Sequence, residues 1–137
     1  MIERIVDSGK ELAIIIRDNY CEAGIHFLTK GDYSQQMAYM HHPKGKIIEA
    51  HIHNYEERSV VYTQEVLVIK RGIIRVDFYN AQHCYIKSVM LYAGDVILLA
   101  SGGHGFEVIE EIDMIEIKQG PYLGERDKIR FEGISAS

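Results

Sequence analysis

Short apolar stretches separated by turn residues follow one another through the second half of the chain, and this pattern limits the fold more than any other feature. In residues 73–79, Ile74, Val76 and Phe78 alternate with Arg75 and Asp77, which is typical of a strand with one buried and one wet face. The strands expected along the chain cover residues 12–17, 25–29, 35–41, 47–53, 60–70, 73–79, 85–92, 96–100, 106–109 and 112–118. Many short strands joined by tight turns predict an all-β fold, an antiparallel sandwich or barrel. A helix over residues 9–17 stays open as an alternative for the first strand.

Length and composition indicate a single globular domain over residues 1–137. A chain of 137 residues with 47% hydrophobic and 26% charged residues has room for one core. The net charge is -5 and the basic residues are scattered, which argues against a nucleic-acid or membrane partner. The start of the chain does not have the layout of a signal peptide, so we expect a cytoplasmic protein. Two cysteines, Cys21 and Cys84, do not form a C-x-x-C pair, which makes a thiolate zinc site or a disulfide framework unexpected.

The charged segment 120–137 begins with Gly120-Pro121 and reads as a tail. Its apolar residues are Tyr122, Ile129 and Phe131. We expect the tail to pack against the outside of the barrel through these three side chains.

Three candidate site residues lie within residues 45–72. If 47–53 is a strand, His51 and His53 project from the same face, because side chains two apart in a strand point the same way. Glu65 shares a strand face with Leu67 and Ile69. A carboxylate on such an apolar face needs a partner.

His104 is the fourth candidate, and it follows two glycines and precedes a third. Glycine lets the backbone turn sharply and leaves space for an imidazole to point inward. If this segment lies beside the His51 and His53 strand, the site would consist of three imidazoles and one carboxylate.

These residues resemble the two motifs of the cupin family. The first motif appears as Gly45-(x5)-His51-x-His53, followed by Glu65-(x6)-Gly72, and the second as a Gly-(x5) stretch from Gly94 that ends in Gly-x-His at His104. The resemblance covers roughly residues 40–110, with the site core at about 45–110.

It implies a jelly-roll barrel in which His51, His53, Glu65 and His104 bind a divalent metal ion. Glu57 is the alternative carboxylate ligand, because the common first motif has its Glu closer to the second His. Imidazole and carboxylate ligands suit Zn, Ni, Fe, Mn or Co.

A narrower similarity points to cupin sugar-nucleotide ketoisomerases of surface-polysaccharide pathways. It rests on residues 64–68 before residues 72–76, and on Gly120-Pro121-Tyr122 followed by Ile129-Arg130. The resemblance implies dTDP-linked keto sugars as substrates and His51 and His53 as acid and base, often without metal.

Three functions therefore stay open. The leading expectation is a metal-dependent isomerase or epimerase that acts on a small polar metabolite such as a sugar or nucleotide sugar, with catalytic candidates His51, His53 and Glu65. The alternatives are a metal-free ketoisomerase that uses His51 and His53, and a non-catalytic cupin that binds a small ligand. We also expect a homodimer, since small barrels of this kind pair through edge strands that would otherwise be exposed.

Overall fold

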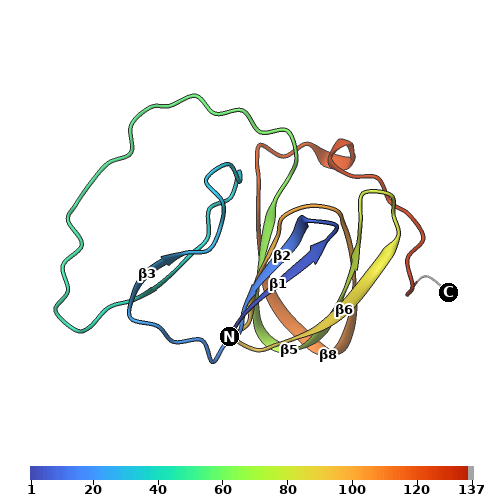
Figure 1. Cartoon of the computed structure of the whole chain (residues 1–137), viewed down its shortest axis with the longest axis horizontal. Helices are drawn as coiled ribbons and strands as arrows, with labels where there is room; N and C mark the ends of the chain where they lie inside the picture. Colours follow the sequence, from blue (N-terminus) through green and yellow to red (C-terminus); the bar gives the residue numbers. More distant parts are fainter. Residues whose placement is uncertain (136–137) are drawn as a thin grey trace.

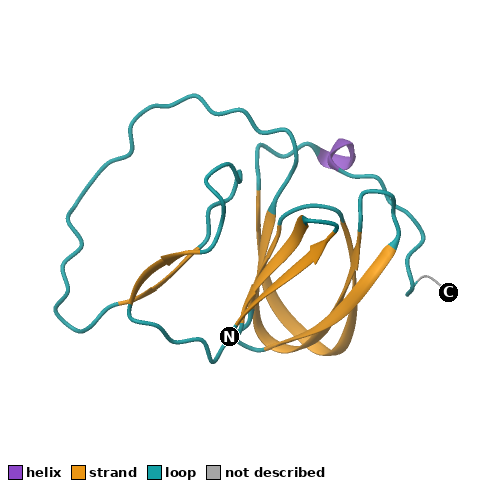
Figure 2. Ribbon diagram, in the orientation of Figure 1, coloured by secondary structure: helices purple, strands orange, loops and turns teal. Residues whose placement is uncertain are grey.

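The computed structural model describes residues 1–135, and in this range the chain is nearly all strand and loop (Figures 1 and 2). Its elements are β1 (Ile2–Asp7), β2 (Lys10–Ile16), β3 (Gly24–Phe27), β4 (Ala38–His41), β5 (Glu65–Tyr79), β6 (Tyr85–Tyr92), β7 (Val96–Leu99), β8 (Gly103–Lys118) and the 3₁₀ helix η1 (Gly124–Asp127). The all-β prediction is confirmed. The alternative of a helix over residues 9–17 is wrong, because that stretch is β2 and pairs with β1 and β7.

The main sheet is antiparallel and curls into an open half-barrel (Figure 1). Its strand order is β1-β2-β7-β5-β6, and β8 pairs with the opposite edge of β5 along almost its whole length. One edge of β5 is shared, because its first residues pair with β7 and its last residues pair with β6. The long β5–β8 ribbon is therefore the backbone of the fold.

The concave face of the sheet carries the larger core. The buried side chains there are Ile5, Leu12, Ala13, Ile15, Leu67, Ile69, Ile74, Val76, Phe78, Leu91, Ile97 and Leu99. The buried face expected in residues 73–79 is confirmed, since Ile74, Val76 and Phe78 all belong to this core. The expected wet face is wrong at Asp77, which is 1% exposed because it pairs with Arg75. A second cluster on the convex face joins Ile14 and Leu98 to Met37, from the segment that connects β3 to β4.

In two places, a pair of strands expected from the sequence is one continuous strand in the structure. Residues 60–70 and 73–79 were expected to be separated by a turn, but β5 runs without interruption from Glu65 and only bends near Gly72. Residues 106–109 and 112–118 likewise belong to the single strand β8. The register slips where the two strands bend together, so the glycine and charged residues there mark a bulge rather than a turn.

The segment from 42 to 64, which we call the arm, contains no strand. The expected strand 47–53 is wrong, because a strand needs a hydrogen-bonded neighbour and this stretch has none among the described residues. The arm leaves β4, arcs away from the half-barrel and returns to β5 (Figures 1 and 2). Every residue from 43 to 62 is exposed.

The tail returns to the half-barrel around Tyr79 and Asp77, where the Ile134 N–H donates to the Tyr79 hydroxyl and the Ser135 hydroxyl donates to Asp77. Phe131 packs edge-on against Tyr79 with ring centroids 5.1 Å apart, and it stacks on His83 at 4.2 Å. Tyr122 and Ile129, which were expected to pack as well, are 83% and 82% exposed. Only the Phe131 contact of the expected three is therefore present. In the part of the chain that the structure describes, no helix has the length and apolar character needed to cross a membrane.

Candidate active site

The bend at Gly72 shapes the site. Gly72 has a φ of 91°, and a Cβ there would lie 2.1 Å from the carbonyl oxygen of Glu111 on β8. Only glycine allows so close an approach in this backbone conformation. The bend folds the ribbon over its concave face, so that the first residue of β5 comes near the first residues of β8.

Glu65 and His104 meet across this concave face. Glu65 is opposite Lys118 in the ladder and His104 is opposite Phe78, so the two residues come from opposite ends of the ribbon. The Oε1 atom of Glu65 is nevertheless 2.7 Å from Nε2 of His104. Their side chains are 15% and 27% exposed. The partner that Glu65 was expected to need on its apolar face is therefore His104.

The carboxylate of Glu65 is held ionised by its neighbours. The hydrogen bond with His104 is the largest influence, and together with hydrogen bonding from Glu116 and the charge of Lys118 it lowers the pKa of Glu65 to about 2, although burial opposes this. The pKa of Glu116 is raised, chiefly because its carboxyl group hydrogen-bonds to Glu65. Glu65 is thus the ionised member of a cluster in which His104 is its closest partner.

The surroundings of the pair are apolar on one side and polar on the other. Leu67 and Ile69 lie beside Glu65 on the same face of β5 and are buried. The His104 ring lies 5.5 Å from that of Phe106, which is 37% exposed. A polar pair at the edge of an apolar surface can bind a small molecule and exchange a proton with it.

Glu116 and Lys118 were not identified from the sequence. In the ladder Glu116 is opposite Leu67 and Lys118 is opposite Glu65, which places both on the concave face. In the sequence, Glu116 and Lys118 alternate with the apolar residues Ile115 and Ile117, which indicates that the two charged side chains share one strand face. That face can be identified as the concave one only when β8 is known to be a single strand that pairs with β5.

The His51 and His53 pair lies elsewhere, on the arm. Their ring centroids are 5.3 Å apart, and Nδ1 of His51 is 2.8 Å from the carbonyl oxygen of Glu49. Both residues are exposed. Glu57, the alternative ligand, is also on the arm, where it lines a small open hollow with Arg58 and Ser59.

A single copy of the chain does not assemble the four ligands that the cupin resemblance implies. Among residues 1–135, no three His, Cys, Asp or Glu side chains gather into a group that would hold a metal ion. Glu65 and His104 contact each other, whereas His51 and His53 lie on the arm, away from this pair. Two of the four predicted ligands are therefore together in one copy.

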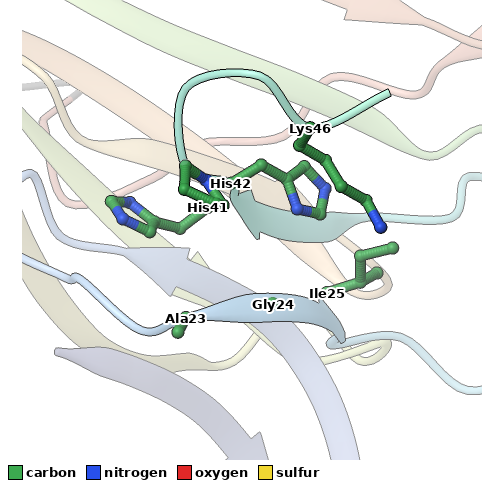
Figure 3. A pocket seen from close by; sticks show the side chains of 7 residues that line it. Ala23, Gly24, Ile25, His41, His42 and Lys46 are labelled. Carbon is green, nitrogen blue, oxygen red and sulfur yellow. The ribbon is translucent and has the colours of Figure 1, made fainter. Parts of the chain in front are cut away.

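A second open hollow lies where the arm leaves the β3–β4 hairpin. His42 and Lys46 line it on one side, and Ala23, Gly24 and Ile25 line it on the other. Figure 3 shows the His42 ring beside Lys46, with the His41 ring pointing away from both. The Nε2 atom of His42 is buried and lacks a hydrogen-bond partner among the described residues. This hollow does not include Glu65 or His104.

Comparison with protein-family models, with curated proteins and with solved structures gives no match for this chain. The class of protein is therefore defined by its own features, an all-β half-barrel with a carboxylate–imidazole pair on its concave face.

Proposed function

We propose that this protein is a cupin-like enzyme that moves a proton at a carbon next to a carbonyl group in a small polar metabolite, such as a sugar or nucleotide sugar. The observation that carries this proposal is the contact of 2.7 Å between Glu65 Oε1 and His104 Nε2. The pair lies on the concave face with both side chains partly exposed, 15% for Glu65 and 27% for His104.

In this proposal His104 exchanges the proton and Glu65 positions it. A carboxylate that accepts the Nε2 hydrogen fixes the imidazole tautomer and stabilises the imidazolium that forms when the ring takes up a proton. His104 removes the proton from the carbon, the electron pair of the broken C–H bond forms the C=C bond of an enolate, and the carbonyl oxygen takes the negative charge. Return of the proton to a neighbouring position gives the isomer, so atoms and charge balance.

Two neighbouring residues support a sugar or nucleotide-sugar substrate. Lys118 is opposite Glu65 in the β5–β8 ladder, and its positive charge helps to lower the pKa of Glu65. A diphosphate group of a nucleotide sugar would be attracted to such a cation. The Glu116 carboxyl group offers a hydrogen-bonding partner for sugar hydroxyls beside the pair.

The test is proton exchange in D₂O, followed by NMR with a dTDP-linked keto sugar. The wild-type protein should exchange the hydrogen next to the carbonyl for deuterium. His104→Ala should slow the exchange by about 100-fold or more, the range expected for loss of a positioned acid–base group. Glu65→Gln should slow it as well, and it should also change the pH profile of the remaining exchange, which a purely structural role would leave alone.

The matched control is His26→Ala, which removes a half-buried imidazole on β3 whose contact is the carbonyl oxygen of Ala23. This variant should exchange deuterium at the wild-type rate. Full exchange by His104→Ala, or no exchange by the wild-type protein with keto sugars, would contradict the proposed function.

A further inference from the structure

The arm and strand β8 are both left without a partner in a single copy. β8 spans 16 residues and pairs only with β5 among the described elements, so its other edge presents unpaired N–H and C=O groups. A long exposed strand edge of this kind is a template for pairing with another chain. The arm is an extended segment without a neighbour of its own.

Apolar side chains accompany both features. On the arm, Ile52, Tyr55 and Val61 are 89%, 94% and 84% exposed. On β8, Val108 and Ile117 are 54% and 51% exposed. So much apolar surface on one stretch and one strand marks an interaction site rather than scattered surface residues.

The start of the arm and the middle of β8 carry opposite charges. The arm begins with Lys44 and Lys46, both exposed, and neither takes part in an ion pair among the described residues. The middle of β8 carries Glu110 and Glu111, which are also exposed and without a cationic partner there. The rest of the arm is mixed in charge, with Glu49, Glu56 and Glu57 beside Arg58, so the attraction to β8 acts at the start of the arm.

We propose that the arm of one copy lies along β8 of a second copy, and the reverse, so that His51 and His53 of one copy face the Glu65–His104 pair of the other. A reciprocal exchange of identical segments is a low-cost route to a two-fold dimer. This dimer proposal rests on the proposed function only because it takes Glu65 and His104 as the site. The site is then shared between two copies, and the two imidazoles of the arm join the Glu65–His104 pair from which one copy holds them apart.

The first test compares two pairs of exposed residues by sedimentation equilibrium. Ile52→Glu/Val61→Glu alters the arm, whereas Tyr122→Glu/Ile129→Glu alters the tail at sites of equal exposure, 83% and 82%. In a lone copy all four side chains are in solvent, so neither variant should unfold, which circular dichroism checks. Wild type and the tail variant should be dimers, and the arm variant should dissociate with a dimer Kd raised at least about 100-fold, because unpaired charges would be buried. A monomeric wild type, or an arm variant that dimerises like the tail variant, would overturn the proposal.

The second test asks whether the arm reaches the site of the other copy, and it needs neither a metal nor a substrate. The two exposed cysteines, Cys21 and Cys84, are first changed to Ser. One tagged chain then carries His53→Cys, a differently tagged chain carries His104→Cys, and both are co-expressed and treated with a short bismaleimide.

A covalent product that carries both tags supports exchange of the arm. The control replaces the first chain by one with Ile129→Cys, whose side chain is equally accessible but lies on the tail, and it should give no mixed product. Absence of the His53–His104 product, with both thiols shown to be reactive, would overturn the shared site. Since this result is independent of catalysis, it separates failure of the shared site from failure of the proposed function.

Discussion

Glu65 and His104 make contact at 2.7 Å although they belong to opposite ends of the same ribbon. Their meeting depends on the bend of β5 and β8 at Gly72, since in a flat ribbon the residues opposite Lys118 and Phe78 would be far apart. The same bend makes the concave face, so the fold and the site have one structural origin. The stability of the bend can therefore be tested apart from the chemistry.

Gly72→Ala should destabilise the protein by about 2 kcal/mol or more. The added Cβ would lie 2.1 Å from the Glu111 carbonyl oxygen, and the φ of 91° is strained for any other residue. Urea unfolding of the two proteins measures the difference. Gly31→Ala is the matched control, because its Cβ would meet nothing within 4 Å and its backbone is not in the left-handed region. Equal unfolding midpoints for Gly72→Ala and wild type would contradict the close approach.

Asp77 should make the protein sensitive to acid. Burial alone would raise its pKa, but hydrogen bonds from Arg75 at 2.8 Å and Ser88 at 2.6 Å hold the pKa below the ordinary value of 3.8. The native state therefore binds fewer protons than the unfolded state, so this stabilisation is complete above the ordinary pKa and disappears as the pH falls through the lower native value. Asp77→Asn should cost about 1–3 kcal/mol at pH 7, because Arg75 loses a charged partner.

The difference in unfolding free energy between wild type and Asp77→Asn should shrink as the pH falls from neutrality to about 2. Chemical unfolding at several pH values provides the measurement. Glu107→Gln is the control, since Glu107 contacts the same arginine with a side chain that is 50% exposed, and it should change stability by less than about 0.5 kcal/mol. A constant difference for Asp77→Asn across the pH range would show that the carboxylate is not stabilised in the fold.

Phe131 should account for most of the stabilisation that the tail provides. It packs on Tyr79 and stacks on His83, and the Tyr79 hydroxyl also accepts a hydrogen bond of 2.9 Å from the backbone N–H of Ile134. Phe131→Ala should cost about 1–3 kcal/mol in thermal or urea unfolding. Ile129→Ala, at a side chain that is 82% exposed, should be nearly neutral. Equal effects of the two substitutions would mean that the tail does not dock through Phe131.

Metal content should depend on the arm. Elemental analysis of protein purified without a His tag or chelator should give near-stoichiometric transition metal in the wild type and little in His51→Ala/His53→Ala, because two of the four proposed ligands are lost. The matched control is His41→Ala/His42→Ala, which removes the other histidine pair near the arm. Full metal content in the His51 and His53 variant would exclude these residues as ligands.

The carboxylate ligand can be identified in the same way. Glu65→Gln should reduce metal affinity at least about tenfold, whereas Glu57→Gln should leave it unchanged, because Glu65 already contacts His104. Isothermal titration with Zn²⁺ compares the three proteins. A loss of metal affinity in Glu57→Gln but not in Glu65→Gln would identify Glu57 on the arm as the carboxylate ligand.

The all-β class of the fold could be predicted from local sequence, because the alternation of Ile74, Val76 and Phe78 in β5 is a local signal. The apolar neighbours of Glu65 are a second local signal, and they indicated that its carboxylate needs a partner. The continuity of β5 through Gly72 could not be predicted, because glycine favours a bulge and a turn equally well by composition. Within the arm, residues 47–53 were expected to form a strand. A strand exists only with a neighbour, and the identity of neighbours is a long-range property that a single sequence does not state.

The number of residues between Glu65 and Gly72 also limits where insertions and deletions can occur in this chain. Side chains in a strand alternate between two faces, so an insertion or deletion of one residue between Glu65 and the bend would turn the carboxylate to the convex face, away from His104. Residues 43–62, which are exposed and outside any strand, carry no such parity. Related chains should therefore vary in length between β4 and β5, while the interval from carboxylate to bend stays fixed.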